Sequence, residues 1–244
     1  MADDNPENST TTMFDTKAAT WGDKPRRVKL ARDVARAIRD TVNVTPGMDV
    51  LDFGCGTGLL ALQFQPLVRS VTGIDSSAGM LAILEEKVRS QHLTNVTTRC
   101  IDLEHGDRFE GQYDLVMSSM TFHHIRDVRP ILEILLQVLK PGGTLAIADL
   151  DCDNGKFHDT PDGVFHNGFD RCILKNHFEE AGFTHVRNRT AAIVQKEFSL
   201  RKILPFSVFL MTGRREMTVQ AGRRIVLTAS GNGMAGCSGE DRVE

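Results

Sequence analysis

A glycine-rich run with a carboxylate before it is the first candidate for ligand chemistry in this chain. The run is Gly54-Cys55-Gly56-Thr57-Gly58, and Asp52 stands two residues before its first glycine. Because glycine has no Cβ, such a run turns tightly and lets a ligand lie against the outward-pointing amides of a helix start. Glycine turns also make plain strand–helix connections, so the run alone leaves both interpretations open.

Asp75 sharpens this prediction. It follows the expected strand 71–74, a position from which a carboxylate can accept hydrogen bonds from both hydroxyls of a ribose. An aspartate before a helix can instead act as a cap, but Ser76 and Ser77 are available for that role. Asp102 follows the next expected strand in the same way. It is a candidate for contact with an adenine amino group, or else a solvated loop aspartate.

The spacing of the glycines distinguishes between nucleotide ligands. A dinucleotide dehydrogenase is expected to have GxGxxG after an apolar strand, because the helix dipole then holds the diphosphate. Here glycines stand at every second position, and Asp52 would repel a diphosphate. This arrangement favours a ligand that has a ribose, an adenine and a positively charged amino group but no phosphate. S-adenosylmethionine meets these conditions.

Two histidines follow the expected strand 113–117 and are the candidates for proton transfer. A neutral imidazole near pH 7 accepts a proton from a hydroxyl or an amine, so His123 or His124 could act as a general base. Alternatively, one packs inward and the other caps the next helix. Four further side chains on or after the next strand are candidates for the same cavity: Asp149, Asp151, His158 and His166.

Hydrophobic spacing predicts the elements that position these residues. Strands are expected at 48–53, 71–74, 96–101, 113–117, 144–150, 185–196 and 206–212, with helices at 25–41, 59–68, 77–88, 127–139 and 169–181. Strands that alternate with helices at this spacing predict an α/β fold with a parallel sheet covered on both faces. Ligands of such sheets bind at the carboxyl ends of the strands. Residues 1–12 are predicted to be a disordered tail, and residues 217–244 a poorly specified one.

Composition narrows the class of protein. The 244 residues suit one large domain, and 29 basic against 32 acidic residues give no overall basic field for a DNA duplex. Scattered cysteines without a CxxC pair predict neither disulfides nor a metal site. No signal peptide and no run of about 18 apolar residues is present, so we expect a cytoplasmic protein without a membrane span. The cysteines are Cys55, Cys100, Cys152, Cys172 and Cys237.

Several segments together resemble the class I S-adenosylmethionine-dependent methyltransferases. They are 50–58, 72–77 with Met80, 101–103, 113–116, 120–125 and 139–143, in the order and spacing of that superfamily between about residue 14 and residue 213. The resemblance is to the small-molecule branch (methyltransferase type 11), which includes enzymes of ubiquinone and menaquinone biosynthesis. It implies a Rossmann-like, three-layer α/β/α fold with a seven-stranded, mostly parallel sheet whose last strand is antiparallel.

The resemblance also implies cofactor contacts. The glycines would line the methionine part of S-adenosylmethionine, Asp52 would orient its amino group, and Asp75 would hold its ribose. Met80 and Leu103 would sandwich the adenine, although Met80 is also typical of a core methionine. Ser118 would offer its backbone carbonyl to the ammonium group. The full set is Asp52, Gly54, Cys55, Gly56, Gly58, Asp75, Ser76, Met80, Asp102, Leu103 and Ser118.

The segment 14–27 resembles an N-terminal lid that closes over the acceptor and excludes water. It belongs to an expected methyltransferase domain at 13–216, in which 13–45 form the lid and first helix. Phe14, Trp21 and Phe122 are the predicted substrate contacts, with simple packing of the first helix as the alternative. The helix 25–41 carries a basic face, which is either solvated or a contact for a substrate anion: Arg26, Arg27, Lys29, Arg32, Arg36 and Arg39.

The predicted reaction is in-line transfer of a methyl group to a small-molecule acceptor. Positioning supplies much of such catalysis, and a base is required only when the acceptor must lose a proton. The Asn-Pro-Pro-Tyr type of motif, found in methyltransferases that act on adenine or glutamine, is absent after residue 117. The alternatives are a protein or RNA acceptor, a non-catalytic S-adenosylmethionine-binding partner of another methyltransferase, and a dehydrogenase.

Overall fold

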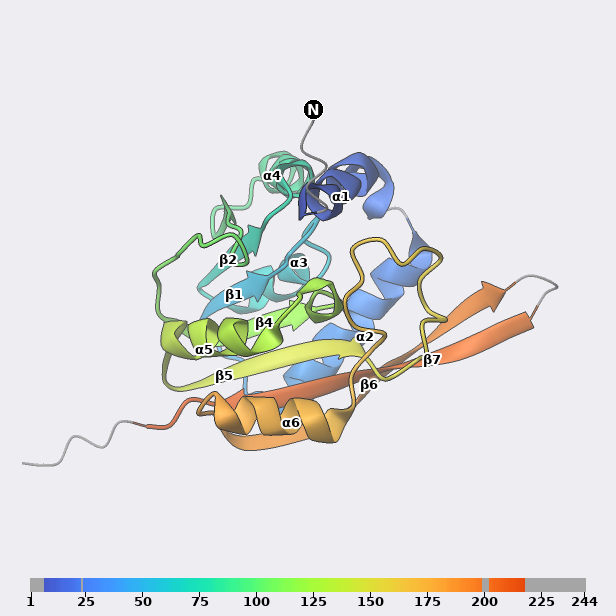
Figure 1. Ribbon diagram of the computed structural model, residues 1–244. Helices are drawn as coiled ribbons and strands as arrows, with labels where there is room; N and C mark the ends of the chain where they lie inside the picture. Colours follow the sequence, from blue (N-terminus) through green and yellow to red (C-terminus); the bar gives the residue numbers. More distant parts are fainter. Residues whose placement is uncertain (1–6, 23, 199–201, 218–244) are drawn as a thin grey trace, which may run out of the picture.

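A single seven-stranded sheet organises the computed structural model, which describes residues 7–22, 24–198 and 202–217 (Figure 1). Its strand order is β3-β2-β1-β4-β5-β7-β6. The pairs among β1 to β5 are parallel, and β7 runs antiparallel to both β5 and β6. The strands are β1 (Asp49–Phe53), β2 (Ser70–Asp75), β3 (Val96–Cys100), β4 (Tyr113–Ser119), β5 (Leu139–Leu150), β6 (Thr184–Phe198) and β7 (Lys202–Arg214). The predicted architecture, including its antiparallel last strand, is confirmed.

Helices cover both faces of this sheet, as predicted (Figure 1). They are α1 (Glu7–Trp21), α2 (Pro25–Thr41), α3 (Ala61–Phe64), α4 (Ala78–Ser90), α5 (Val128–Val138) and α6 (Arg171–Glu180), with single 3-10 turns at Gln65–Leu67 and Phe122–His124. Successive residues of a strand point to opposite faces. In β5, Leu145 and Ile147 join the core beneath α5 and α6, whereas Ala146 and Ala148 join the core beneath α2 and α3.

The strand order reverses between β1 and β4. From β1 the chain moves outward through β2 to the edge strand β3, and β4 then returns to the other side of β1. In open α/β sheets the ligand crevice lies at such a reversal, beyond the carboxyl ends of the strands. The fold therefore brings together the loops after β1, β2, β4 and β5.

Several predicted boundaries differ from the structure. Residues 7–12 form the first turns of α1 rather than a disordered tail, while residues 1–6 and 218–244 lie outside the described residues. The helix predicted at 59–68 is only α3 and a 3-10 turn, because Pro66 has no amide proton to continue an α-helix. β5 begins at Leu139 instead of residue 144. In the part of the chain that the structure describes, no helix has the length and apolarity to cross a membrane.

Candidate active site

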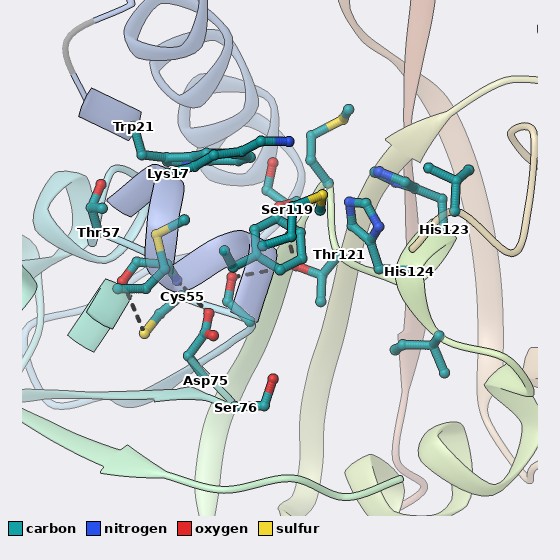
Figure 2. Close-up of a pocket in the computed structure, with 18 of the residues that line it drawn as sticks. Lys17, Trp21, Cys55, Thr57, Asp75, Ser76, Ser119, Thr121, His123 and His124 are labelled. Atoms are coloured by element: carbon teal, nitrogen blue, oxygen red, sulfur yellow. Dashed lines mark hydrogen bonds between the residues drawn. The ribbon is translucent and has the colours of Figure 1, made fainter. Parts of the chain in front are cut away.

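A cavity of about 730 Å³ lies at the carboxyl ends of the central strands, where the strand order reverses. Its volume falls within the range of roughly 300–1,000 Å³ that is usual for small-ligand sites. Figure 2 shows the loop after β1 and Asp75 on one side and His123 with His124 on the other, with Lys17 and Trp21 of α1 above. The cavity thus has two halves, one built around the glycine loop and one around the histidines.

The glycine loop forms one wall of this cavity. Gly56 has a φ of +52°, and a Cβ built on it would have no heavy atom within 4 Å, so its backbone faces open space. Gly58 has a φ of +81°, but a Cβ there would overlap the side chain of Leu84 in α4. Gly56 therefore leaves room for a ligand, whereas Gly58 lets α4 pack closely against the loop.

Asp75 holds the glycine loop and still faces the cavity. Its Oδ2 accepts a hydrogen bond from the amide of Gly56 at 2.7 Å, and its Oδ1 accepts one from the amide of Ser77 at 2.9 Å. Ser77 is the N-cap of α4, because its hydroxyl accepts from the amide of Met80. Burial raises the pKa of Asp75. The cap is therefore the serine, and the aspartate has carboxylate lone pairs left for a ligand.

Asp52 is a buried carboxyl with an unused oxygen. It is 2% exposed, and among the described residues its Oδ2 has no hydrogen-bond partner. Burial raises its pKa to about 8, and the nearby charge of Asp75 adds to the rise against a backbone hydrogen bond from Ala61. A ligand cation beside Asp52 would favour its ionised form, so this position suits an ammonium group.

Asp102 lines the cavity but is also tied to its own loop. Its Oδ1 accepts from the amides of Glu104 and His105, and its Oδ2 lies 2.7 Å from Nδ1 of His105. Met80 lines the cavity while being only 2% exposed, so it belongs both to the wall and to the core. The other predicted cofactor residues among the lining residues are Gly54, Cys55, Ser76 and Leu103.

Three residues predicted as contacts, Gly58, Ser118 and Phe122, are not among those that line the cavity. Strand β4 runs to Ser119, two residues past its predicted end, so Ser118 is fully buried within the sheet. Phe122 is also fully buried and packs edge-on against Phe53, with 5.9 Å between the ring centres. From this segment the cavity receives Ser119, Met120, Thr121, His123, His124, Ile125 and Arg126.

Helix α1 and the start of α2, which contain the segment predicted as a lid, line the cavity. The ring of Phe14 packs edge-on against Trp21 at 5.5 Å and against His124 at 5.0 Å. The guanidinium of Arg27 lies 3.4 Å from the centre of the Trp21 ring and donates to the Trp21 carbonyl at 3.2 Å. Burial, with repulsion from Arg26, lowers the pKa of Arg27. Arg27 lines the cavity and has no ion-pair partner among the described residues.

Asp15 anchors α1 to the start of α4, beside the half of the cavity that contains the glycine loop. The sequence did not reveal this role. Its Oδ1 accepts hydrogen bonds from the hydroxyl of Ser77 at 2.5 Å and from the amide of Gly79 at 2.8 Å. A Cβ on Gly79 would lie 2.9 Å from that same oxygen, so the glycine allows α1 to approach. Because more than sixty residues separate the partners, no local pattern could have indicated this contact.

The histidine half is built on a buried pair. Nδ1 of His123 lies 2.7 Å from Oδ1 of Asp149, whose Oδ2 accepts from the His123 amide at 3.2 Å. Burial would raise the pKa of Asp149, but the charge and hydrogen bond of His123 outweigh it and lower that pKa. The pair leaves Nε2 as the imidazole nitrogen without a described hydrogen bond, on a residue that lines the cavity. This is the arrangement of an oriented general base.

The other predicted candidates divide between the cavity and the scaffold. His124 and His158 line the cavity, and burial with repulsion from His123 lowers their pKa values to about 3 and about 4. Asp151 instead pairs with Arg171 at 2.6 Å, and His166 bonds the carbonyl of Ile125 through Nε2 at 2.9 Å. Neither of these two belongs to the lining of the cavity, so both are structural.

Comparison with known proteins agrees with this geometry. The family model of a methyltransferase domain matches residues 50–143. An uncharacterized methyltransferase of Schizosaccharomyces pombe is 31% identical over 154 residues, which are 57% of this chain and 54% of the relative. A ubiquinone biosynthesis O-methyltransferase of Bradyrhizobium is 30% identical over 57% of this chain and 60% of its own. The chain spans about half the length of the curated relatives it matches.

Solved structures share the fold at low sequence identity. The YcgJ protein of Bacillus subtilis superposes with a TM-score of 0.62 and 16% identity over 75% of this chain and 98% of its own. Phosphoethanolamine N-methyltransferase 2 of Haemonchus contortus, solved with S-adenosyl-L-methionine, superposes with a TM-score of 0.61 and 17% sequence identity. The match covers 76% of this chain and 52% of that protein. Sheet order, site and domain match define a methyltransferase fold. Residues 50–143 match a methyltransferase domain, and the chain is similar over about half its length to S-adenosylmethionine-dependent methyltransferases of class I.

Proposed function

We propose that this protein transfers a methyl group from S-adenosylmethionine to a hydroxyl group of a small molecule. The observation that carries the proposal is a single cavity with the carboxyls Asp52 and Asp75 in one half and the His123–Asp149 pair in the other. Several of its relatives are named as O-methyltransferases, of ubiquinone biosynthesis or of malonyl-[acyl-carrier protein]. A cytoplasmic location belongs to the proposal and fits the free thiols of the described cysteines.

The residues of the first half fit the cofactor. Asp52, with its unpaired oxygen, would take the ammonium group, and Asp75 would take the ribose. The half-buried and unpaired Arg27 would balance the carboxylate of the methionine part. Met80 and Leu103 would enclose the adenine. When bound, the cofactor supplies a methyl group on a sulfonium sulfur, and the electrons of that carbon–sulfur bond return to sulfur as the acceptor oxygen takes the methyl group.

The second half would remove the proton that a hydroxyl acceptor must lose. Asp149 holds the proton on Nδ1 of His123, and this leaves Nε2 as the acceptor nitrogen. The hydroxyl proton would pass to Nε2, and the buried carboxylate would stabilise the resulting imidazolium, as in other oriented histidine bases. Asp149 does not line the cavity, so it is a positioning residue. Phe14 and Trp21 would exclude water above the reacting atoms.

A small acceptor fits the form of the site. The cavity of about 730 Å³ is covered by α1. The half that contains the histidines, called the acceptor half from here on, has aromatic walls, and the half that contains the glycine loop is called the cofactor half. A protein or RNA acceptor would have to displace this lid, in a chain with a net charge of only −3. A non-catalytic binding role would leave the His123–Asp149 pair without a purpose.

The first experiment is calorimetric titration of the folded protein with S-adenosylmethionine. We expect micromolar binding that weakens at least 10-fold, about 1.4 kcal/mol, in Asp75→Ala. Asp33→Ala is the matched control, because this partly buried aspartate pairs with Lys29 within α2 and does not line the cavity. A screen of small hydroxyl compounds with labelled cofactor follows. Failure of the folded wild type to bind the cofactor would overturn the proposal, and methylation of peptides or RNA alone would overturn its acceptor class.

A further inference from the structure

One imidazole of the acceptor half has no part in the proposed proton transfer. His158 lies in the loop between β5 and α6 and lines the same cavity as His123 and His124. Its ring centre is 4.8 Å from that of His123 and 5.8 Å from that of His124, and it packs edge-on against Phe157 at 5.1 Å. The three imidazoles therefore form one cluster at the acceptor end.

The Nε2 atom of His158 is buried without a hydrogen bond. Among the described residues it is one of only four such side-chain atoms, and Asp52 Oδ2 in the cofactor half is another. An unsatisfied buried polar atom costs about 1–3 kcal/mol, so proteins rarely retain one without a reason. The Asp52 oxygen fits a group of the cofactor. By the same reasoning, the His158 nitrogen points to a polar group of the acceptor.

The chemistry of this position selects an oxygen as that polar group. Burial, with repulsion from His123, keeps the His158 imidazole neutral near pH 7, since its pKa is lowered to about 4. A neutral imidazole nitrogen pairs with a hydroxyl or a carbonyl and does not attract an anion as an imidazolium would. A metal ion is not the partner that the geometry offers, because no three His, Cys, Asp or Glu side chains in residues 7–22, 24–198 and 202–217 are placed to hold one.

The walls around the cluster define the rest of the ligand. Phe14 packs on His124, Phe157 packs on His158, and Phe165 and Val194 line the same cavity. Aromatic and aliphatic walls favour an apolar, flat body that buries its surface against them. Charged side chains, among them Arg26, Asp159 and Asp162, also line the cavity, and the imidazole cluster supplies its neutral nitrogen acceptors.

We infer that His158 is an acceptor-binding residue that hydrogen-bonds a second oxygen of the acceptor, close to the hydroxyl that His123 deprotonates. The acceptor class is an apolar, preferably aromatic molecule with a hydroxyl for methylation and a further hydroxyl or carbonyl nearby. This inference rests on the proposed function, because it takes His123 as the site of proton transfer. It adds a residue that selects between acceptors with one and two oxygens.

Binding of simple probes tests this inference. The protein is saturated with S-adenosylhomocysteine, which corresponds to the cofactor after methyl transfer, and is titrated calorimetrically with phenol, catechol and resorcinol. We expect one of the two-oxygen probes to bind at least 10-fold more tightly than phenol, which corresponds to about 1.4 kcal/mol. In His158→Phe this preference should fall below about 2-fold, with phenol affinity unchanged. His158→Gln keeps a polar group at the end of the side chain and should restore part of the preference.

Controls separate this inference from the proposed function. His123→Phe should weaken all three probes and leave binding of S-adenosylhomocysteine unchanged. If S-adenosylhomocysteine binds but the wild type shows no preference for either two-oxygen probe, or binds no probe, the inference about His158 is overturned and the proposed function stands. A similar loss for all probes in His158→Phe would also overturn it, because the residue would then be structural. Failure to bind S-adenosylhomocysteine overturns both proposals.

Discussion

The two halves of the cavity are built in different ways. The cofactor half uses carboxyls and backbone amides that directly follow β1 and β2, so its parts are close in the sequence as well as in space. The acceptor half joins α1, the turn after β4 and the loop after β5, and it holds a cluster of imidazoles beside aromatic rings. We propose that the first half binds a zwitterionic ligand and the second an apolar one that loses a proton.

This difference indicates how specificity is divided in the molecule. The cofactor half is fixed by strand ends, whose positions the sheet determines, so we expect it to be rigid and specific. The acceptor half is formed largely by α1 and by loop residues 152–168, segments that can change with little effect on the sheet. Phe14 and Asp15 join the halves, because neighbouring residues of one helix contact His124 and the start of α4.

The largest effect is expected from replacing His123, the proposed base of the acceptor half. His123→Phe should lower the rate of methyl transfer by about 10²–10⁴-fold, the usual contribution of a general base, because the hydroxyl proton has no acceptor. Calorimetry should give the same affinity for S-adenosylmethionine within about 2-fold, because Asp52 and Asp75 are untouched. Asp149→Asn should lower the rate as well and shift its pH profile, since the imidazolium loses its partner. An equal loss of cofactor binding in His123→Phe would contradict the division into halves.

The lowered pKa of the buried His124 imidazole predicts a loss of stability in acid. Burial lowers the pKa of His124 to about 3, below an unfolded value of about 6.5. Between these values the unfolded state binds more protons, so the free energy of unfolding falls as pH falls, by up to about 1.4 kcal/mol per pH unit for this group. Urea unfolding at pH 4–7 should show a weaker pH dependence in His124→Phe. His158 remains in this variant and should retain part of the slope, so an unchanged slope would refute the role of His124.

The positions of the residues in the cofactor half were largely predictable from the sequence, whereas in the acceptor half the candidate residues were predictable but their contacts were not. The glycine run, Asp52 and Asp75 stand where strands end, and strand ends follow from hydrophobic runs and turns. Helix α1 has no apolar stripe from which it could be predicted. Its contact with α4 joins Asp15 to Ser77, more than sixty residues away in the sequence. Ser118 lies inside β4 rather than after it, because pairing with β5 extends β4 beyond its apolar run. Tertiary contacts, which spacing does not encode, decided each of these.

A third prediction concerns Asp15, which links helix α1 to the start of α4. Asp15→Ala removes the acceptor of two hydrogen bonds at the start of α4, so the free energy of unfolding should fall by about 0.5–2 kcal/mol, as for loss of a helix cap. Hydrogen exchange should show faster exchange in α1 but not in β1. Gly79→Ala should act similarly, because its methyl group meets Asp15. Asp33→Ala is the control, because Asp33 pairs with Lys29 within α2. Equal loss of protection throughout the sheet would argue against an anchoring role.

The smallest effect tests the charge of the cofactor half. Asp52 has a pKa of about 8, so most molecules hold a proton there at pH 7 before the ligand binds. An ammonium group beside Oδ2 would favour the carboxylate, so binding of S-adenosylmethionine should release close to one proton at pH 7. Titrations in buffers with different ionisation enthalpies measure this number. Asp52→Asn should remove most of the release. A release that persists in Asp52→Asn would assign the proton to Asp75, whose pKa is also raised by burial. The ammonium group would then lie nearer to the carboxylate of Asp75 than we propose.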